Sequence, residues 1–184
     1  MKKTVLVVLA DGFEEIEAVT PIDVLRRAGL EVIVAGVGKR EVPGAHGITV
    51  ETDIILEQYQ GSPDAIVLPG GMPGASNLQK SQAVNDIIRK VAKAGKLIGA
   101  ICASPAVVLA PAGILEGKRA TCYPGFEDEF GSKVVFTEER VVRDGQVITS
   151  RGPGSALEFS LELVSHLVND ETAKKLAQTM VAKD

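Results

Sequence analysis

Short, almost purely apolar runs alternate along this chain with longer segments whose apolar residues recur every three or four positions. Runs of the first kind predict buried strands, and the second spacing predicts amphipathic helices. The predicted strands cover residues 4–10, 30–35, 48–51, 65–68, 97–101, 118–121, 140–143 and 146–149. The predicted helices cover residues 14–28, 83–94, 106–110, 156–168 and 171–182. A loop or hairpin is expected over residues 36–47, and Asp144 with Gly145 is typical of a tight hairpin turn.

The order of these elements predicts an α/β fold. Strands that alternate with helices form a mostly parallel sheet with helices on both faces. The 184 residues, 45% of them hydrophobic, are enough for one compact domain, and no linker or repeat divides residues 1–184. In such a sheet, ligands bind beyond the carboxyl ends of the strands, where the strand order reverses.

Composition and charge narrow the classes of function. The net charge is −4 without a basic block, so nucleic-acid binding is not expected. The N-terminal apolar run ends at residue 10 and is far too short for a membrane span or a signal peptide. Two cysteines and no such leader favour a reducing, cytoplasmic location. With only His46 and His166, and no Cys-x-x-Cys pair, a metal site is not expected.

Cys102 is the residue with the most distinctive local context. It follows the predicted strand 97–101 and precedes a short predicted helix, and its neighbours Ala100, Ala103 and Ser104 are small enough for a sharp turn. The N–H groups at the start of a helix would favour the thiolate form, which is the nucleophile. The same segment also fits a buried, inert cysteine, because free cysteine is among the most buried residue types.

Three glutamates stand at the start of the helix that follows the first strand. For Glu14 and Glu15, a favourable interaction with the positive helix end is a sufficient explanation. Glu17 lies one turn in and could turn inward over the strand ends. If it meets Cys102 there, two anions are costly in one pocket, so Glu17 would be protonated and donate a hydrogen bond to the thiolate. A solvated position on the helix surface is the alternative.

Two further strand ends carry candidate chemistry. Gly70 and Gly71 follow the strand 65–68, and paired glycines let backbone N–H groups approach an oxyanion, although they also occur in ordinary turns. Arg151 follows the strand 146–149, where it would anchor an acid group or a dimer partner, or form a surface ion pair.

The strand predicted over residues 118–121 is followed by two more candidates. Cys122 lacks the context of a strand-to-helix turn and is expected to be a small core residue. Tyr123 either supplies a hydroxyl to the pocket or only packs against its neighbours.

Four of these segments together resemble the DJ-1 (ThiJ/PfpI) superfamily, and its DJ-1 branch in particular. The matching segments are residues 9–17, 67–71, 100–103 and 149–154. They come in the family's order, and the likeness spans essentially the whole chain. The resemblance implies a flavodoxin-like three-layer α/β sandwich and a homodimer. It also implies that Cys102 is an oxidation-prone nucleophile with Glu17 as the protonated acid beside it, and that Gly70, Gly71 and the N–H group of Ala103 form the oxyanion-binding turn.

The resemblance also implies roles around the site or at a subunit interface for five further residues. These are Glu14, Arg27, His46, Arg151 and Pro153. The chain departs from the family at two positions. Ala103 stands where peptidase-like relatives carry a histidine, so a cysteine–histidine hydrolase pairing is missing. Tyr123 stands where the DJ-1 branch often has a histidine, and a phenol is a poor base at neutral pH.

By this resemblance the chain is expected to be a cofactor-independent glyoxalase, which converts methylglyoxal to lactate and glyoxal to glycolate through Cys102. Deglycation of early aldehyde adducts on protein or nucleotide amines is a related activity, which these residues do not separate from removal of free aldehyde. A redox sensor or stress-protective chaperone, with Cys102 oxidised to sulfinate, uses the same residues and is the main alternative. A peptidase or amidase is a weaker one.

Overall fold

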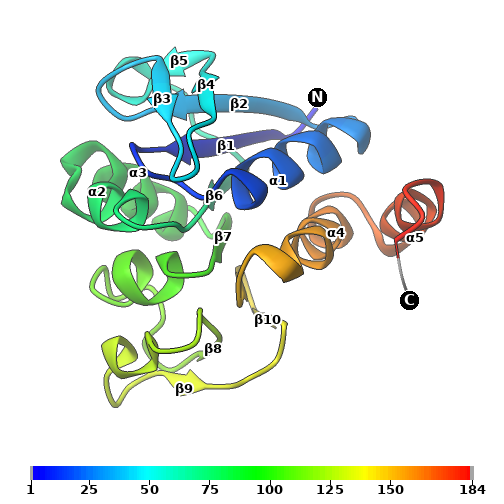
Figure 1. Cartoon of the computed structure of the whole chain (residues 1–184). Coiled ribbons are helices and arrows are strands. Elements are labelled where there is room, and N and C mark those ends of the chain that lie inside the picture. The colour runs from blue at the N-terminus through cyan, green and yellow to red at the C-terminus, as the bar shows by residue number, and fades with distance from the viewer. Residues whose placement is uncertain (1, 183–184) are drawn as a thin grey trace.

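Seven strands form the main sheet of the computed structural model, which describes residues 2–182 (Figure 1). In chain order they are β1 (Thr4–Leu9), β2 (Glu31–Gly36), β5 (Ile54–Ile55), β6 (Ala65–Leu68), β7 (Leu97–Ile101), β10 (Val141–Asp144) and β11 (Val147–Ser150). Across the sheet their order is β10-β11-β7-β6-β1-β2-β5. Every neighbouring pair is parallel except the hairpin of β10 and β11.

Helices cover both faces of this sheet. They are α1 (Glu15–Arg27), α2 (Gly74–Lys80), α3 (Gln82–Lys93), α4 (Ala156–Leu167) and α5 (Asp170–Thr179). Helix α1 packs on β1 and β2 and lies beside α4, whereas α3 packs on β6 and β7 (Figure 1). The β1–β2 and β6–β7 connections run in opposite directions along the sheet, and right-handed crossovers therefore place α1 and α3 on opposite faces. The predicted flavodoxin-like three-layer sandwich is confirmed.

The central strands are apolar throughout because both of their faces are covered. Every residue of β6 and β7 is buried. Gly99 in β7 lets α4 approach the sheet, since a Cβ atom there would lie 2.9 Å from Leu163 Cδ2 and 3.0 Å from Phe159 Cζ. The lack of side-chain bulk in the middle of a strand thus sets the distance between two layers.

Smaller elements surround the sandwich. The hairpin expected around residues 36–51 consists of β3 (Glu41–Pro43) and β4 (Thr49–Glu51). Short helical turns are η1 (Leu56–Gln58), η2 (Pro105–Leu109), η3 (Glu127–Phe130) and η4 (Pro153–Ser155). Helix α2 was not expected from residues 74–80, which include glycine, serine and asparagine. It forms because Ala75 and Leu78 are buried, so packing outweighs poor helix propensity.

Two predicted strands lie outside the main sheet. The strand predicted over residues 48–51 is β4, which pairs with β3. The strand predicted over residues 118–121 is the shorter β8 (Arg119–Ala120), which pairs in parallel with β9 (Val135–Phe136) to form a separate sheet. Strand β8 lies next to β10 and β11 without joining the main sheet.

The carboxyl ends of the parallel strands gather the candidate residues at one edge of the sheet. The strand order reverses between β1 and β6, because β1 leads to β2 on one side and β6 leads to β7 on the other. This is the place where open α/β sheets bind ligands. The segments that follow β1, β6, β7 and β11 all begin at this edge of the sheet.

Candidate active site

Cys102 sits on a tight turn between β7 and the helical turn η2. Its φ angle is +66°, in the left-handed region where a residue other than glycine is strained by about 1–2 kcal/mol. Two backbone hydrogen bonds hold the turn: Cys102 N–H donates to Ser150 O at 2.9 Å, and Cys102 O accepts from Tyr123 N–H at 2.9 Å. Local strain that neighbouring contacts maintain is characteristic of functional sites.

The segment after Cys102 is a π-helical turn. Ala110 N–H donates to Pro105 O, five residues back, at 3.0 Å. Ser104 Oγ donates to Pro69 O at 2.6 Å and so ties this turn to the end of β6. Wide turns of this kind are frequent at functional sites. The sequence shows Ser104 only as a small neighbour of Cys102, and nothing in its local pattern indicates the long-range bond to Pro69.

Glu17 points inward from α1 and is fully buried. Its Oε2 atom accepts a hydrogen bond from Gly70 N–H at 2.8 Å. The Cys102 thiol is close enough to the carboxyl to lower the pKa of Glu17. Its Oε1 atom is also buried and makes no short hydrogen bond within residues 2–182. The structure therefore places Glu17 beside Cys102 rather than on the solvated helix surface.

Gly70 fits between these two side chains only because it has no Cβ. A Cβ atom there would lie 2.6 Å from Cys102 Cβ and 2.8 Å from Glu17 Oε2, both closer than atoms can approach without displacement. Gly71 has φ +86°, and its N–H group and that of Ala103 lower the pKa of the Cys102 thiol. Both N–H groups therefore favour the thiolate.

Burial raises the pKa of Glu17 from 4.5 to about 7. The hydrogen bonds with Cys102 and with Gly70 N–H oppose this rise, and the charge of Glu14 adds to it. The carboxyl can therefore exchange a proton near neutral pH, as a general acid or base must.

Burial also raises the pKa of Cys102, to about 12, and the charge of the Glu17 carboxylate adds to the rise. The N–H groups of Gly71 and Ala103 lower it. The expectation that the helix end favours the thiolate is therefore wrong while Glu17 is ionised, because burial and the carboxylate outweigh these donors. Ionising either acid raises the pKa of the other, so together they carry at most one negative charge around neutral pH.

Tyr123 and Arg151 border the site, and their side chains contact residues other than Cys102. The Tyr123 N–H group donates to Cys102 O, while the residue is 44% exposed and its ring packs against Gly152 and edge-on to Phe126. The Arg151 guanidinium lies 5.9 Å from the centre of the Phe136 ring. It also lowers the pKa of Cys122, which burial raises to about 12.

The remaining predicted residues fall into separate places. Pro153 starts the turn η4, next to the end of β11. Arg27 pairs with Asp23 at the far end of α1, about 15 Å along the helix from Glu17, so it does not belong to the surroundings of Cys102. An interface role for Arg27 stays a prediction.

Glu14, Glu15 and His46 form a cluster at the start of α1. His46 Nδ1 lies 3.0 Å from Glu15 Oε2 and 3.5 Å from Glu14 Oε2. Glu15 is only 5% exposed, and its Oε1 atom accepts hydrogen bonds from the N–H groups of His46 and Ile48. The interaction with the positive helix end therefore explains the position of Glu15 only in part. Its hydrogen bonds also fix the loop between β3 and β4.

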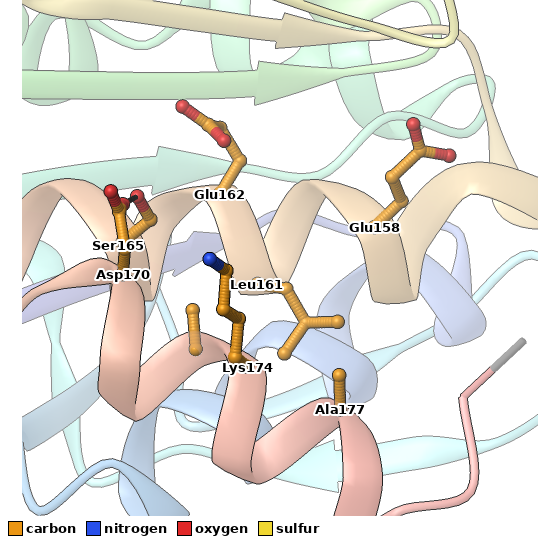
Figure 2. Close-up of a pocket in the computed structure, with 8 residues that line it drawn as sticks. Glu158, Leu161, Glu162, Ser165, Asp170, Lys174 and Ala177 are labelled. Carbon is orange, nitrogen blue, oxygen red and sulfur yellow. Dashed lines mark hydrogen bonds between the residues drawn. The ribbon is translucent and has the colours of Figure 1, made fainter. Parts of the chain in front are cut away.

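A separate surface hollow lies between α4 and α5 (Figure 2). Leu161, Ala173 and Ala177 contribute apolar side chains to its lining, and Glu162 and Lys174 contribute charged ones. None of its lining residues is among the site residues predicted from the sequence, and it takes no part in the chemistry at Cys102.

The fold and site define a class of protein: a flavodoxin-like sandwich with a cysteine on a strand-to-helix turn and a buried carboxyl beside it. The chain belongs to the DJ-1/PfpI family, whose family model matches residues 3–166. Within residues 2–182, the helices are all too short or too polar to span a bilayer.

Named relatives cover the full length of the chain. The Parkinson disease protein 7 homolog of Danio rerio is 43% identical over 99% of this chain and 98% of that protein. The glutathione-independent glyoxalase DJR-1.2 of Caenorhabditis elegans is 37% identical over 97% of this chain and 96% of that protein. Among solved structures, oxidized Toxoplasma gondii DJ-1 is 44% identical with a TM-score of 0.94, covering 97% of this chain and 98% of that one.

Proposed function

We propose that this protein is a cofactor-independent glyoxalase that converts methylglyoxal to lactate and glyoxal to glycolate. The observation that carries this proposal is the buried pair of Cys102 and Glu17 with the Gly71 and Ala103 N–H groups, which lower the pKa of the thiol. The name of the nematode relative supports the same reaction class.

The first step joins the aldehyde to Cys102. Proton transfer from the thiol to the Glu17 carboxylate gives a thiolate beside a protonated acid and leaves the net charge of the pair unchanged. The thiolate then adds to the aldehyde carbon, and the new alkoxide takes up a proton to form a hemithioacetal. The N–H groups of Gly71 and Ala103 stabilise the oxygen while it carries charge.

The second step moves a proton between adjacent carbons. Once ionised, Glu17 removes the proton from the carbon bonded to sulfur, which gives an enediol, and returns it to the neighbouring carbon, which gives a thioester. Water then hydrolyses the thioester to the 2-hydroxy acid and restores the thiol. One water is consumed in each cycle, and no net oxidation occurs.

Lactate formation tests this proposal directly. Loss of methylglyoxal and gain of lactate are followed together for the wild type, Cys102→Ser and Cys122→Ser. We expect many turnovers for the wild type and Cys122→Ser, and none for Cys102→Ser. Lactate production by Cys102→Ser, or stoichiometric aldehyde loss without lactate in the wild type, would contradict the proposal.

Solvent isotope labelling tests the role of Glu17. If the proton passes through a carboxyl that exchanges with water, lactate made in deuterium oxide carries deuterium at its second carbon. A direct hydride shift retains the substrate hydrogen instead. We expect deuterium in the wild-type product and a lower kcat for Glu17→Gln. If pre-formed adducts disappear faster than they release free aldehyde, the protein acts on the adducts themselves, and deglycation is part of its activity.

Oxidation of Cys102 is a second candidate function. Glu17 Oε1 is buried beside the thiol and makes no short hydrogen bond within residues 2–182, so a protonated carboxyl can donate to a sulfinate oxygen. Two equivalents of a hydroperoxide would oxidise the thiolate to sulfenate and then to sulfinate, each being reduced to water or alcohol. Mass spectrometry after peroxide treatment tests this, and we expect sulfinate to accumulate less in Glu17→Gln.

A peptidase role gains no support from the histidines. His46 pairs with Glu15, and His166 Nε2 lies 2.8 Å from Gln146 Oε1. A cysteine hydrolase of that class uses a histidine within hydrogen-bond reach of the sulfur.

We also propose that two copies of the chain associate through the outer face of α1. Ile16 and Val19 of α1 are 54% and 48% exposed, and Ile48, whose N–H group donates to Glu15 Oε1, is 57% exposed, which is unusual for aliphatic side chains. Sedimentation of the wild type and Val19→Glu tests this, with Val168→Glu as the control. We expect a dimer that only Val19→Glu dissociates, and a monomeric wild type would refute it.

A further inference from the structure

The cluster of Glu14, Glu15 and His46 brings three metal-ligating side chains together outside the Cys102 pocket. One ligand atom from each lies within 4.8 Å of the others. Glu14 and Glu15 stand at the start of α1, and His46 lies in the loop between β3 and β4, 31 residues after Glu15. Because these residues are so far apart in the sequence, a search for metal-ligand spacing along the chain does not find them.

We propose that these three side chains form a site for a divalent cation of the zinc(II) class. Zinc accepts mixed carboxylate and imidazole ligands at about 2.0–2.2 Å, which places tetrahedral ligand atoms about 3.3 Å apart. The distances from His46 Nδ1, 3.0 Å to Glu15 Oε2 and 3.5 Å to Glu14 Oε2, lie on either side of that value. A cation replaces the proton between the imidazole and the carboxylates, that proton leaves to solvent, and His46 keeps its Nε2 proton.

The surrounding backbone holds the cluster in place before any cation binds. The N–H groups of His46 and Ile48 donate to Glu15 Oε1 at 2.7 and 3.3 Å, which leaves Oε2 directed at the imidazole. Gly44 permits this close approach, since a Cβ atom there would lie 2.4 Å from Glu15 Oε1. Ala45 N–H donates to Phe13 O at 2.9 Å and joins the loop to the residue before the cluster. Ligands oriented in this way bind metals more tightly than mobile ones.

The charges around the cluster also favour a cation. The positive end of α1 opposes cation binding. The carboxylates of Glu14 and Glu15 carry full charges within 3.5 Å of His46 Nδ1 and outweigh the partial charge of the helix end. Within residues 2–182, neither glutamate forms an ion pair with a lysine or arginine. In a single chain the His46 side chain is 69% exposed.

Cobalt(II) titration followed by zinc(II) competition tests the site on the full chain. We expect one site per chain, a visible cobalt spectrum without a sulfur-to-cobalt charge-transfer band, and displacement of cobalt by zinc. His46→Asn should weaken binding by roughly tenfold or more. His166→Asn, which changes the other histidine, and Cys102→Ser should bind as the wild type does, while circular dichroism confirms that each variant is folded.

Three results would overturn the proposal: no stoichiometric binding by the wild type, unchanged affinity in His46→Asn, or loss of the site in Cys102→Ser, which would place the metal at the thiol. The measurement does not use aldehyde turnover, so it succeeds or fails independently of the glyoxalase proposal.

Discussion

Replacing Glu17 by glutamine should change how the stability of the protein depends on pH. Burial raises the pKa of Glu17 from 4.5 to about 7 in the folded chain, and each pH unit between these values corresponds to about 1.4 kcal/mol. The buried carboxyl therefore favours the folded state fully below pH 4.5, and this advantage is lost as the pH rises to about 7. The loss amounts to about 3 kcal/mol. Glutamine does not ionise, so Glu17→Gln should not show this loss.

Urea unfolding followed by circular dichroism measures the effect at equal chain concentration between pH 4.5 and pH 8. The difference in unfolding free energy between the wild type and Glu17→Gln isolates Glu17, because contributions of other groups such as His46 cancel. Glu158→Gln is the matched control, since Glu158 is half exposed and pairs with Arg140 on the surface. We expect the wild type to lose about 3 kcal/mol relative to Glu17→Gln and little relative to Glu158→Gln. If the unfolding free energies of the wild type and Glu17→Gln changed with pH in the same way, the raised pKa of Glu17 would be refuted.

Substitutions at Gly70, Cys102 and Tyr123 probe the geometry around Cys102. Gly70→Ala should cost about 1–3 kcal/mol and slow the alkylation of Cys102, because a Cβ would meet Cys102 and Glu17, whereas Gly154→Ala has open space and should be silent in urea unfolding. Cys102→Gly should be more stable than Cys102→Ala by about 0.5–1 kcal/mol, since only glycine adopts the +66° φ angle without strain, and equal midpoints would argue against the turn. Tyr123→Phe should leave lactate turnover unchanged, because Tyr123 is 44% exposed and its ring packs on Gly152. A large loss of turnover in Tyr123→Phe would show that the hydroxyl reaches the substrate.

Patterns local to one element predicted most of the fold. The buried runs around β1, β6 and β7 are apolar because both faces of the sheet are covered, and their positions follow from periodicity alone. Elements whose formation depends on distant contacts were missed or misplaced. Helix α2 exists because Ala75 and Leu78 find a core to pack against, and β8 pairs with β9, which comes from a separate segment of the chain.

The same distinction applies to the site. The turn at Cys102 could be predicted from the small residues around a strand end. The inward position of Glu17 depended on the resemblance to a family, because a helix start gives no sign of which glutamate turns inside. The raised pKa of Cys102 was missed because the argument from the helix end took no account of burial. The roles of Ser104 and Glu15 rest on partners 35 and 31 residues away, which no local pattern reveals.

The central claim is that Cys102 and Glu17 lie in one pocket and carry at most one negative charge between them around neutral pH. The ionisation of Cys102 tests this claim most directly. The rate of alkylation by iodoacetamide is measured as a function of pH in the wild type and Glu17→Gln, both carrying Cys122→Ala so that a single thiol reacts. The Glu17 carboxylate contributes to the raised pKa of Cys102, so the account predicts a lower thiol pKa in Glu17→Gln. An unchanged or higher thiol pKa in that variant would contradict it.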